Sequence, residues 1–361
     1  EYYSYYNDNT LHILTNKKSD GTIVNAYSYT YDAAGNQISK TETVDGVLLG
    51  TTAYVYDSAN RLSNVTEPTG KITAYTYDGA GNRITETVTL GEETVTTVYS
   101  YNEQERLISK VEESQNRTKT TTYCYDNNGN QYSSSVGWVE TSDYIPSGLD
   151  LVVLGINDDS ALGEINEFNS QDQIVVAYVG DKTIRFSYNG DGIRVGKNVN
   201  GNAEKYLYDT GNHVVLEVDE NGEQTAENIY GIYNIARVIG NNSYTYLHNG
   251  HGDVVALIDS EENTVNRYTY DAFGVILTST ETVDNPFRYT GYWYDSETGL
   301  YYLMARYYNP VNGRFLSEDP VMEGYNWYVY CDNNPVIYID PNGEAFMFLT
   351  AAIGAGVGGI G

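Results

Sequence analysis

The chain has 361 residues, of which 49 are acidic and 20 are basic, so its formal net charge is −29. This acidic balance argues against binding to a nucleic-acid backbone, which needs clustered Lys and Arg side chains. Two distant cysteines, Cys124 and Cys331, predict neither a disulfide framework nor a zinc site. The four histidines show no metal-ligand spacing, so we expect no metal and no cofactor.

Tyrosine is unusually frequent, with 38 of the 361 residues, and much of it belongs to a repeated unit. The unit reads Tyr-x-Tyr-Asp-x-x-Gly-Asn-x-Ile and is followed by a run rich in Thr and Val. Successive early copies are 21 to 25 residues apart. Full and degenerate copies occupy residues 29–38, 54–62, 75–84, 99–107, 123–130, 186–194, 206–212, 244–250 and 268–274.

Each unit predicts a β-hairpin. Tyr-x-Tyr alternates with period two, which places both rings on one face of a strand. Asp-x-x-Gly-Asn supplies the turn, because Asp bonds forward to the backbone and Gly and Asn tolerate positive φ. A row of such units predicts an all-β, antiparallel strip. An ordinary β-sandwich is the alternative, but it does not explain why nearly the same turn recurs.

The period weakens over residues 131–180, where the run 144–157 (YIPSGLDLVVLGIN) interrupts it. We expect decorated repeats there, without a separate domain. The chain also begins inside a repeat, with neither an initiator Met nor a signal peptide. We therefore expect it to be a segment of a longer protein, with any export signal upstream.

Residues 285–343 carry an ordered series of motifs that the repeats lack. These are FRYTG at 287–291, YDSETGL at 294–300, RYYNP at 306–310, GRFLSEDP at 313–320, NWYVY at 326–330, NNP at 333–335 and DPNG at 340–343. The series closely resembles the RHS repeat-associated core domain, and the whole chain resembles RHS/YD-repeat proteins. The resemblance divides the chain into repeats (1–284), a core domain (285–343) and the start of a hydrophobic, Gly-rich linker (344–361).

This resemblance implies a hollow shell, in which the hairpin strip spirals and the core domain closes one end. In bacterial members the shell encloses a variable C-terminal toxin and serves in competition or host interaction. The expected partners are the chain's own toxin region, with an immunity protein and secretion machinery, and the expected location is secreted or at the cell surface. Related animal teneurins use the barrel in adhesion. With about 280 repeat residues, we expect only a partial, open shell.

In some family members the core domain is an aspartic-type autoprotease that cuts just beyond Asp-Pro-x-Gly. Carried over by motif, its required residues are Arg306, Asp319 and Asp340. Of two neighbouring carboxylates, one would stay protonated as the acid while the other takes a proton from water. Arg306 would hold one carboxylate as an anion. In the alternative, both aspartates belong to ordinary turns and Arg306 is a buried ion-pair partner. Glu344 also departs from the family, which usually has an apolar residue after the glycine.

Two further questions stay open from the sequence. The uncharged run 345–361 is either a linker threaded into the shell or a segment that inserts into a target membrane. For the whole chain, the alternative to encapsulation is a surface adhesin or carbohydrate-binding protein, whose tyrosines would stack on surface glycans. A self-processing peptidase is the third candidate. Tyrosines that interlock or face a cavity favour encapsulation, whereas an outward aromatic strip favours glycan binding.

Overall fold

The computed structural model describes residues 1–114, 117–140, 161–322 and 324–348. Twenty-four of its strands form one antiparallel sheet in which each strand pairs with its neighbours in sequence. These strands are β1 (Tyr2–Tyr5), β2 (Leu11–Lys17), β3 (Ile23–Tyr31), β4 (Gln37–Val44), β5 (Val47–Tyr56), β6 (Leu62–Thr66), β7 (Ile72–Tyr77), β8 (Arg83–Leu90), β9 (Glu93–Tyr101), β10 (Leu107–Glu113), β11 (Arg117–Tyr125), β12 (Gln131–Glu140), β13 (Ala161–Phe168), β14 (Ile174–Val179), β15 (Lys182–Tyr188), β16 (Arg194–Val199), β17 (Asn202–Tyr208), β18 (Val214–Asp219), β19 (Gln224–Tyr230), β20 (Asn234–Ile239), β21 (Asn242–His248), β22 (Val254–Ile258), β23 (Thr264–Tyr270) and β24 (Ile276–Glu281).

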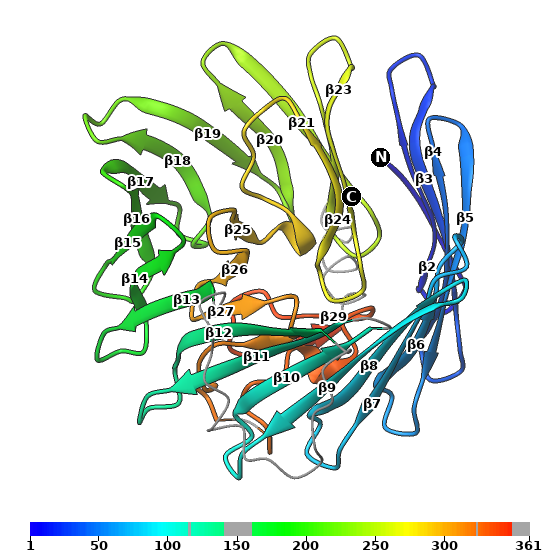
Figure 1. The fold of residues 1–361 in the computed structure, drawn as a ribbon. Helices are drawn as coiled ribbons and strands as arrows, with labels where there is room; N and C mark the ends of the chain where they lie inside the picture. The colour runs from blue at the N-terminus through cyan, green and yellow to red at the C-terminus, as the bar shows by residue number, and fades with distance from the viewer. Residues whose placement is uncertain (115–116, 141–160, 323, 349–361) are drawn as a thin grey trace.

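The predicted all-β strip of antiparallel hairpins is therefore confirmed. Figure 1 shows the strip curled into a nearly complete ring around the segment that follows it, which is drawn in orange and red. The ring is not a flat stack of two sheets, so the β-sandwich alternative is wrong. The period-breaking run 144–157 lies outside the described residues, although β12 and β13 on either side of it still pair.

The turn of each unit is closed by its aspartate. In the hairpin of β3 and β4, Oδ1 of Asp32 accepts the N–H groups of Ala34 and Asn36, both at 2.9 Å. The Asn36 side chain donates back to Asp32 Oδ2 at 3.1 Å, and Gly35 has a φ of +88°. That left-handed conformation costs a residue without a Cβ little, which is why glycine stands there.

The two tyrosines of a unit have different roles. The first is buried, with at most 9% exposure at Tyr29, Tyr54, Tyr75, Tyr99, Tyr123, Tyr206 and Tyr268. The hydroxyl of the second donates to a backbone carbonyl oxygen of the preceding hairpin at 2.5–2.9 Å, in the pairs Tyr56–Gln37, Tyr77–Leu62, Tyr101–Arg83, Tyr188–Ile174, Tyr208–Arg194 and Tyr270–Val254. The tyrosines thus interlock consecutive hairpins.

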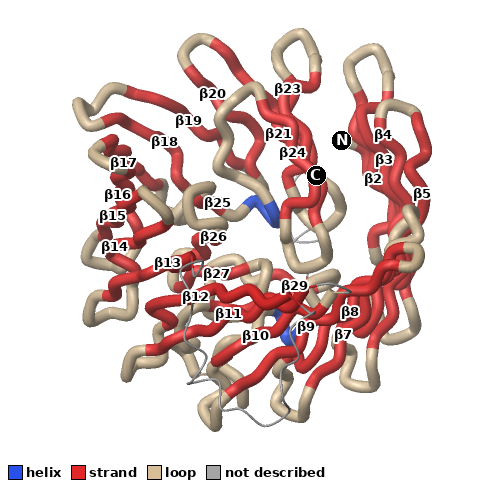
Figure 2. The backbone as a smooth tube through the Cα atoms, viewed as in Figure 1, coloured by secondary structure: helices blue, strands red, loops and turns tan. Residues whose placement is uncertain are grey.

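The two ends of the strip meet through side chains. Asn16 Nδ2 donates to the His248 carbonyl at 2.9 Å, and the Gly250 N–H donates to the Tyr29 hydroxyl at 2.7 Å. A buried cluster around Leu14 joins β2 and β3 to β21 and β22. The described strands contain no β1–β24 pairing, so the strip remains open in its hydrogen bonding, as expected. The tube in Figure 2 shows the gap between these ends.

The inner segment consists of short elements, and we call residues 285–343 the plug. It contains β25 (Trp293–Asp295), β26 (Leu300–Leu303), β27 (Arg306–Asn309) and β28 (Arg314–Phe315) in one small sheet. Two 3-10 turns, η1 (Tyr289–Gly291) and η2 (Cys331–Asn333), accompany them. Finally β29 (Tyr338–Ile339) pairs with β30 (Met347–Phe348), just beyond the plug.

Buried polar contacts attach the plug to the strip, alongside two hydrophobic clusters that both parts share. Asp295 pairs with Arg194 of β16 at 2.5 Å, and Arg314 Nη1 donates to the side chain of Asn82, in a repeat turn, at 2.9 Å. Asn334 Nδ2 likewise donates to the Asn60 carbonyl at 2.8 Å. The repeat turns thus supply the surface that holds the plug.

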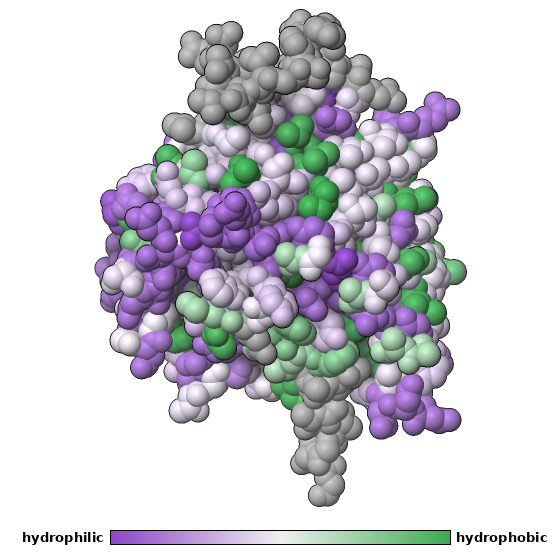
Figure 3. Space-filling model, turned by 90° about the horizontal axis from the view of Figure 1, so that it is seen from below, coloured by the Kyte–Doolittle hydropathy of each residue, from purple (hydrophilic) through white to green (hydrophobic). Residues whose placement is uncertain are grey.

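The surface seen in Figure 3 carries a broad band of hydrophilic residues, with hydrophobic residues in small separate groups. Within the described ranges, no helix is long and apolar enough to cross a membrane. Most of the uncharged run 345–361 lies outside those ranges.

Candidate functional site

The three residues carried over by motif come from three separate parts of the plug. Arg306 begins β27, Asp319 follows β28 after a short turn, and Asp340 comes directly after β29. The structure brings them together: Arg306 Nη2 lies 3.4 Å from Asp319 Oδ2 and 3.5 Å from Asp340 Oδ2. One guanidinium nitrogen therefore bridges two carboxylates that are 21 positions apart in sequence.

Every nitrogen of the Arg306 guanidinium has a partner. Nε donates to the Gly343 carbonyl oxygen at 2.5 Å, and Nη1 donates to that of Trp327 at 2.9 Å. The Phe315 ring stacks 3.6 Å from Cζ. Only 3% of Arg306 is exposed, and this burial lowers its pKa, while Asp319 and Asp340 oppose the shift. The two carboxylates thus stabilise a cation in a site that is largely closed to water.

Asp340 folds the chain that follows it into a tight turn. Its Oδ1 accepts the N–H of Gly343 at 2.8 Å and that of Glu344 at 3.2 Å. Burial raises the pKa of Asp340, whereas Arg306 and the backbone N–H groups lower it. Asp319 also stands in a turn, since its Oδ1 accepts the Val321 N–H at 2.8 Å. The aspartates therefore close turns and also face the buried Arg306, and self-cleavage by this cluster stays a prediction.

Two supporting residues were not found from the sequence. The Tyr292 hydroxyl accepts the Asp340 N–H at 2.9 Å and lies 3.0 Å from the Tyr330 hydroxyl. Trp327 contributes only its backbone carbonyl oxygen, which accepts from Arg306 Nη1. Trp327 lies inside the motif at 326–330 and Tyr292 lies between two motifs, but a backbone carbonyl or a distant hydroxyl leaves no pattern in a sequence. Cys331 is also buried in the plug, and burial raises the pKa of its thiol well above the usual range, so the thiol is neutral.

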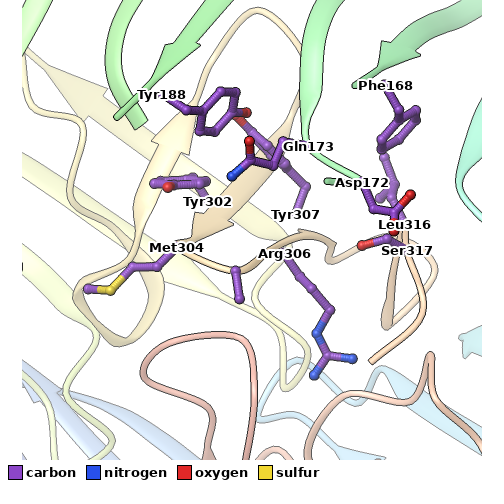
Figure 4. A pocket seen from close by; sticks show the side chains of 11 residues that line it. Phe168, Asp172, Gln173, Tyr188, Tyr302, Met304, Arg306, Tyr307, Leu316 and Ser317 are labelled. Carbon is purple, nitrogen blue, oxygen red and sulfur yellow. The ribbon is translucent and has the colours of Figure 1, made fainter. Parts of the chain in front are cut away.

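A small pocket of about 10 Å³ lies beside Arg306 but not at its charged end. Tyr188, Tyr302 and Gln173 line it, and Figure 4 shows the guanidinium directed away from them. Its volume is about that of one water molecule. The guanidinium of Arg306 therefore points away from these pocket residues.

A larger cavity of about 590 Å³ lies on the concave side of the strip, between β3–β8 and β21–β24. Tyrosines, threonines and charges of both signs line it, including Lys40, Glu42, Thr52 and Tyr54. Across the part of the chain that the structure describes, no group of three or more His, Cys, Asp or Glu residues could hold a metal ion.

The plug and the strip are similar to parts of known proteins. The family model "Teneurin YD-shell" matches residues 51–336. The tRNA nuclease WapA of Bacillus subtilis (strain 168) is 43% identical over 171 residues, which are 44% of this chain and 7% of the relative. The toxin protein Tse5 of Pseudomonas aeruginosa is 45% identical over 60 residues, which are 16% of this chain and 5% of the relative.

Among solved structures, the crystal structure of TcdB2-TccC3 matches with a TM-score of 0.43 and 17% sequence identity, covering 93% of this chain and 22% of the other. The chain spans less than a tenth of the length of the WapA proteins that it matches. The family model covers well over half of the 361 residues. Together with the repeated tyrosine-linked hairpins, this match shows that the chain belongs to the Teneurin YD-shell family.

Proposed function

We propose that this chain is part of a protein shell that encloses a C-terminal polypeptide, a toxin or another effector, and helps to deliver it. The observation that carries the proposal is the direction of the repeat tyrosines. The first of each unit is buried and the second bonds the preceding hairpin, so they do not form the outward aromatic strip that an adhesin would use on glycans. The strip curls instead around an inner space.

The inner wall fits an unfolded guest chain. Hydroxyl groups and charges of both signs line the cavity, and such groups can bond the exposed backbone and side chains of a polypeptide. The relatives also support an effector as the enclosed polypeptide, because they include proteins named as tRNA nucleases and a toxin. The partners would be the chain's own C-terminal region, with an immunity protein and secretion machinery, and the location would be secreted or cell-surface.

Paired cysteine variants on β5 test this proposal. Thr52 lines the cavity, whereas its neighbour Thr51 is exposed outside it. In a Cys124→Ser background, Thr52→Cys should react with a small maleimide but not with a bulky polymer-linked maleimide, and Thr51→Cys should react with both. In the full-length gene product, a guest chain should also protect Thr52→Cys from the small reagent. Equal reactivity at the two positions, with and without the downstream region, would contradict enclosure.

A second function, self-cleavage by the plug, is favoured by the cluster of Arg306, Asp319 and Asp340. Arg306 Nη2 lies 3.4 Å from Asp319 and 3.5 Å from Asp340, an arrangement that suits two carboxylates acting as acid and base beside one cation. Cleavage would break the covalent link between the shell and the guest chain. Asp319→Asn and Asp340→Asn should each abolish the processed fragment on a denaturing gel, whereas Asp332→Asn, at an exposed position of the plug, should not. Unchanged fragments in the first two variants would remove the enzymatic role.

A further inference from the structure

We infer that the run 349–361 binds inside the cavity of about 590 Å³ and holds the start of the enclosed polypeptide against the wall of the shell. The inference rests on the proposed enclosure and names the segment that the cavity receives. The run lies outside the described residues and consists only of Leu, Thr, Ala, Ile, Val and Gly. It follows directly on β30, so the place and direction of β30 decide where the run begins.

The direction of β30 leads the chain towards the floor of the cavity. β30 is antiparallel to β29, with Phe348 opposite Tyr338. Two positions before Tyr338 stands Val336, which lines the cavity. Because the strands run in opposite directions, the residues that follow Phe348 advance towards Val336. Two residues of a strand span about 7 Å, so the run begins about that far from the cavity floor.

An apolar surface joins the end of β30 to the cavity. The ring of Tyr338 lies 5.0 Å from that of Phe346 and 4.4 Å from that of Phe348, measured between centroids. Tyr338 also packs against the buried cluster that contains Val336 and Tyr54, both of which line the cavity. Phe346 and Phe348 are still 48% and 47% exposed. A run without charge can extend this surface, because burying it desolvates no ionised group.

The small residues of the run suit the polar part of the wall. Five of its 13 residues are Gly and three are Ala, so its backbone can approach the wall closely. Buried backbone groups need hydrogen-bond partners, and hydroxyl and amide groups such as those of Thr52 and Asn249 line the cavity. Two lining residues also have a buried polar atom without a partner among the described residues, the hydroxyl of Tyr27 and Nε2 of His251. Such buried atoms are costly when they stay unpaired, and backbone groups of the run would bond them.

The charges of the wall require no charged occupant. Both lysines that line the cavity have a carboxylate partner in the wall, since Lys71 lies 2.8 Å from Glu67 and Lys40 lies 3.9 Å from Glu42. Thirteen extended residues span at most about 45 Å, which is ample to enter the cavity from its floor. The run then acts as a non-covalent anchor of the enclosed polypeptide, and delivery requires the run to leave the cavity.

Disulfide trapping in the 361-residue chain tests the inference. In a Cys124→Ser background, Ala352→Cys in the run is combined with Ala272→Cys, which lines the cavity, or with Ala53→Cys, which is exposed and adjoins the cavity-lining Thr52 on β5. Adjacent residues of a strand face opposite sides of the sheet. A bound run should form the disulfide at position 272 faster than at position 53 by about tenfold or more, because binding raises the effective concentration of the thiol. Equal rates for the two pairs would overturn the inference.

A charge in the run supplies the second measurement. Ile353→Asp would have to bury a carboxylate, so it should slow the disulfide between positions 272 and 352 by about tenfold or more, whereas the matched control Ile353→Val should leave the rate unchanged. An unchanged rate in Ile353→Asp would contradict binding of the run. In the full-length gene product, protection of Thr52→Cys from the small maleimide without this disulfide would overturn the inference and leave enclosure standing. The absence of both protection and disulfide would overturn both.

Discussion

Replacing Asp295 by Asn should strongly destabilise the shell, because Asp295 is the buried anion that attaches the plug to the strip. The side chains of Arg194 and Asp295 are 1% and 0% exposed, and Nη1 of Arg194 lies 2.5 Å from Asp295 Oδ2. Lys197 Nζ is a further 3.6 Å from Oδ1. The variant keeps the shape of the side chain but leaves two cations facing a neutral amide. Breaking a buried ion pair in this way costs about 3–5 kcal/mol.

The measurement is the free energy of unfolding from urea titrations followed by tyrosine and tryptophan fluorescence. Glu112→Gln is the control, since the Lys119–Glu112 pair is also in direct contact, at 2.9 Å, but is about 30% exposed, and such pairs contribute at most about 1 kcal/mol. Adding Arg194→Met to Asp295→Asn should recover part of the lost unfolding free energy, because it removes one buried cation that has lost its partner. An Asp295→Asn loss no larger than that of Glu112→Gln would refute the reasoning.

Three further predictions concern the repeats. Tyr56→Phe removes the hydroxyl that donates to the Gln37 carbonyl at 2.7 Å, and should lower the free energy of unfolding by about 1 kcal/mol in the same titration. Burial raises the pKa of Asp271 to about 6, so the charged form of this carboxylate opposes folding above that pH, and the penalty vanishes below about pH 4. Asp271→Asn should therefore be more stable than the parent by up to about 3 kcal/mol at pH 8 and equally stable at pH 4. An equal gain in stability at both pH values would contradict this. Gly250→Ala would place a Cβ 2.7 Å from side chains of β2 and β3, where the strip ends meet. At Gly190, which also follows an Asn in a repeat turn, a Cβ would have nothing within 4 Å. Gly250→Ala should therefore lower the melting temperature, by the equivalent of about 1–3 kcal/mol, and Gly190→Ala should not.

The hairpins could be predicted from the sequence because their causes are local. The aspartate of a unit bonds N–H groups two and four residues ahead, as Asp78 does to Ala80 and Asn82 at 2.9 and 2.8 Å, so a window of five residues contains the whole turn. The curvature is different. It depends on how Tyr77 reaches the Leu62 carbonyl, 15 positions away, and on cumulative twist between many strands. The sequence indicated a strip, and the resemblance to a family supplied the shell.

In the candidate site too, only the features with a local sequence signal could be predicted. Arg306, Asp319 and Asp340 were found because each stands in a short motif, and their proximity follows from packing inside the plug. The contacts that complete the cluster, from Arg306 Nε to the carbonyl oxygen of Gly343 and from Asp340 Oδ1 to the N–H of Glu344, involve backbone atoms. Every residue carries those atoms, so no residue pattern marks them, and only coordinates identify which peptide group lies in the cluster.

The asparagine that ends the repeat turn shows how one residue type links the strip to the plug. Asn82 is 0% exposed. Its Nδ2 donates to Asp78 Oδ2 at 2.9 Å, while its Oδ1 accepts from Arg314 Nη1 at 2.9 Å and from Asn326 Nδ2 at 2.7 Å. An aspartate there would set a second carboxylate against Asp78 and could not donate to it, and an alanine would leave the arginine and the amide unpaired in a buried site. Turn closure alone would accept several residues, so it is the simultaneous demand from the plug that explains why asparagine stands at this position.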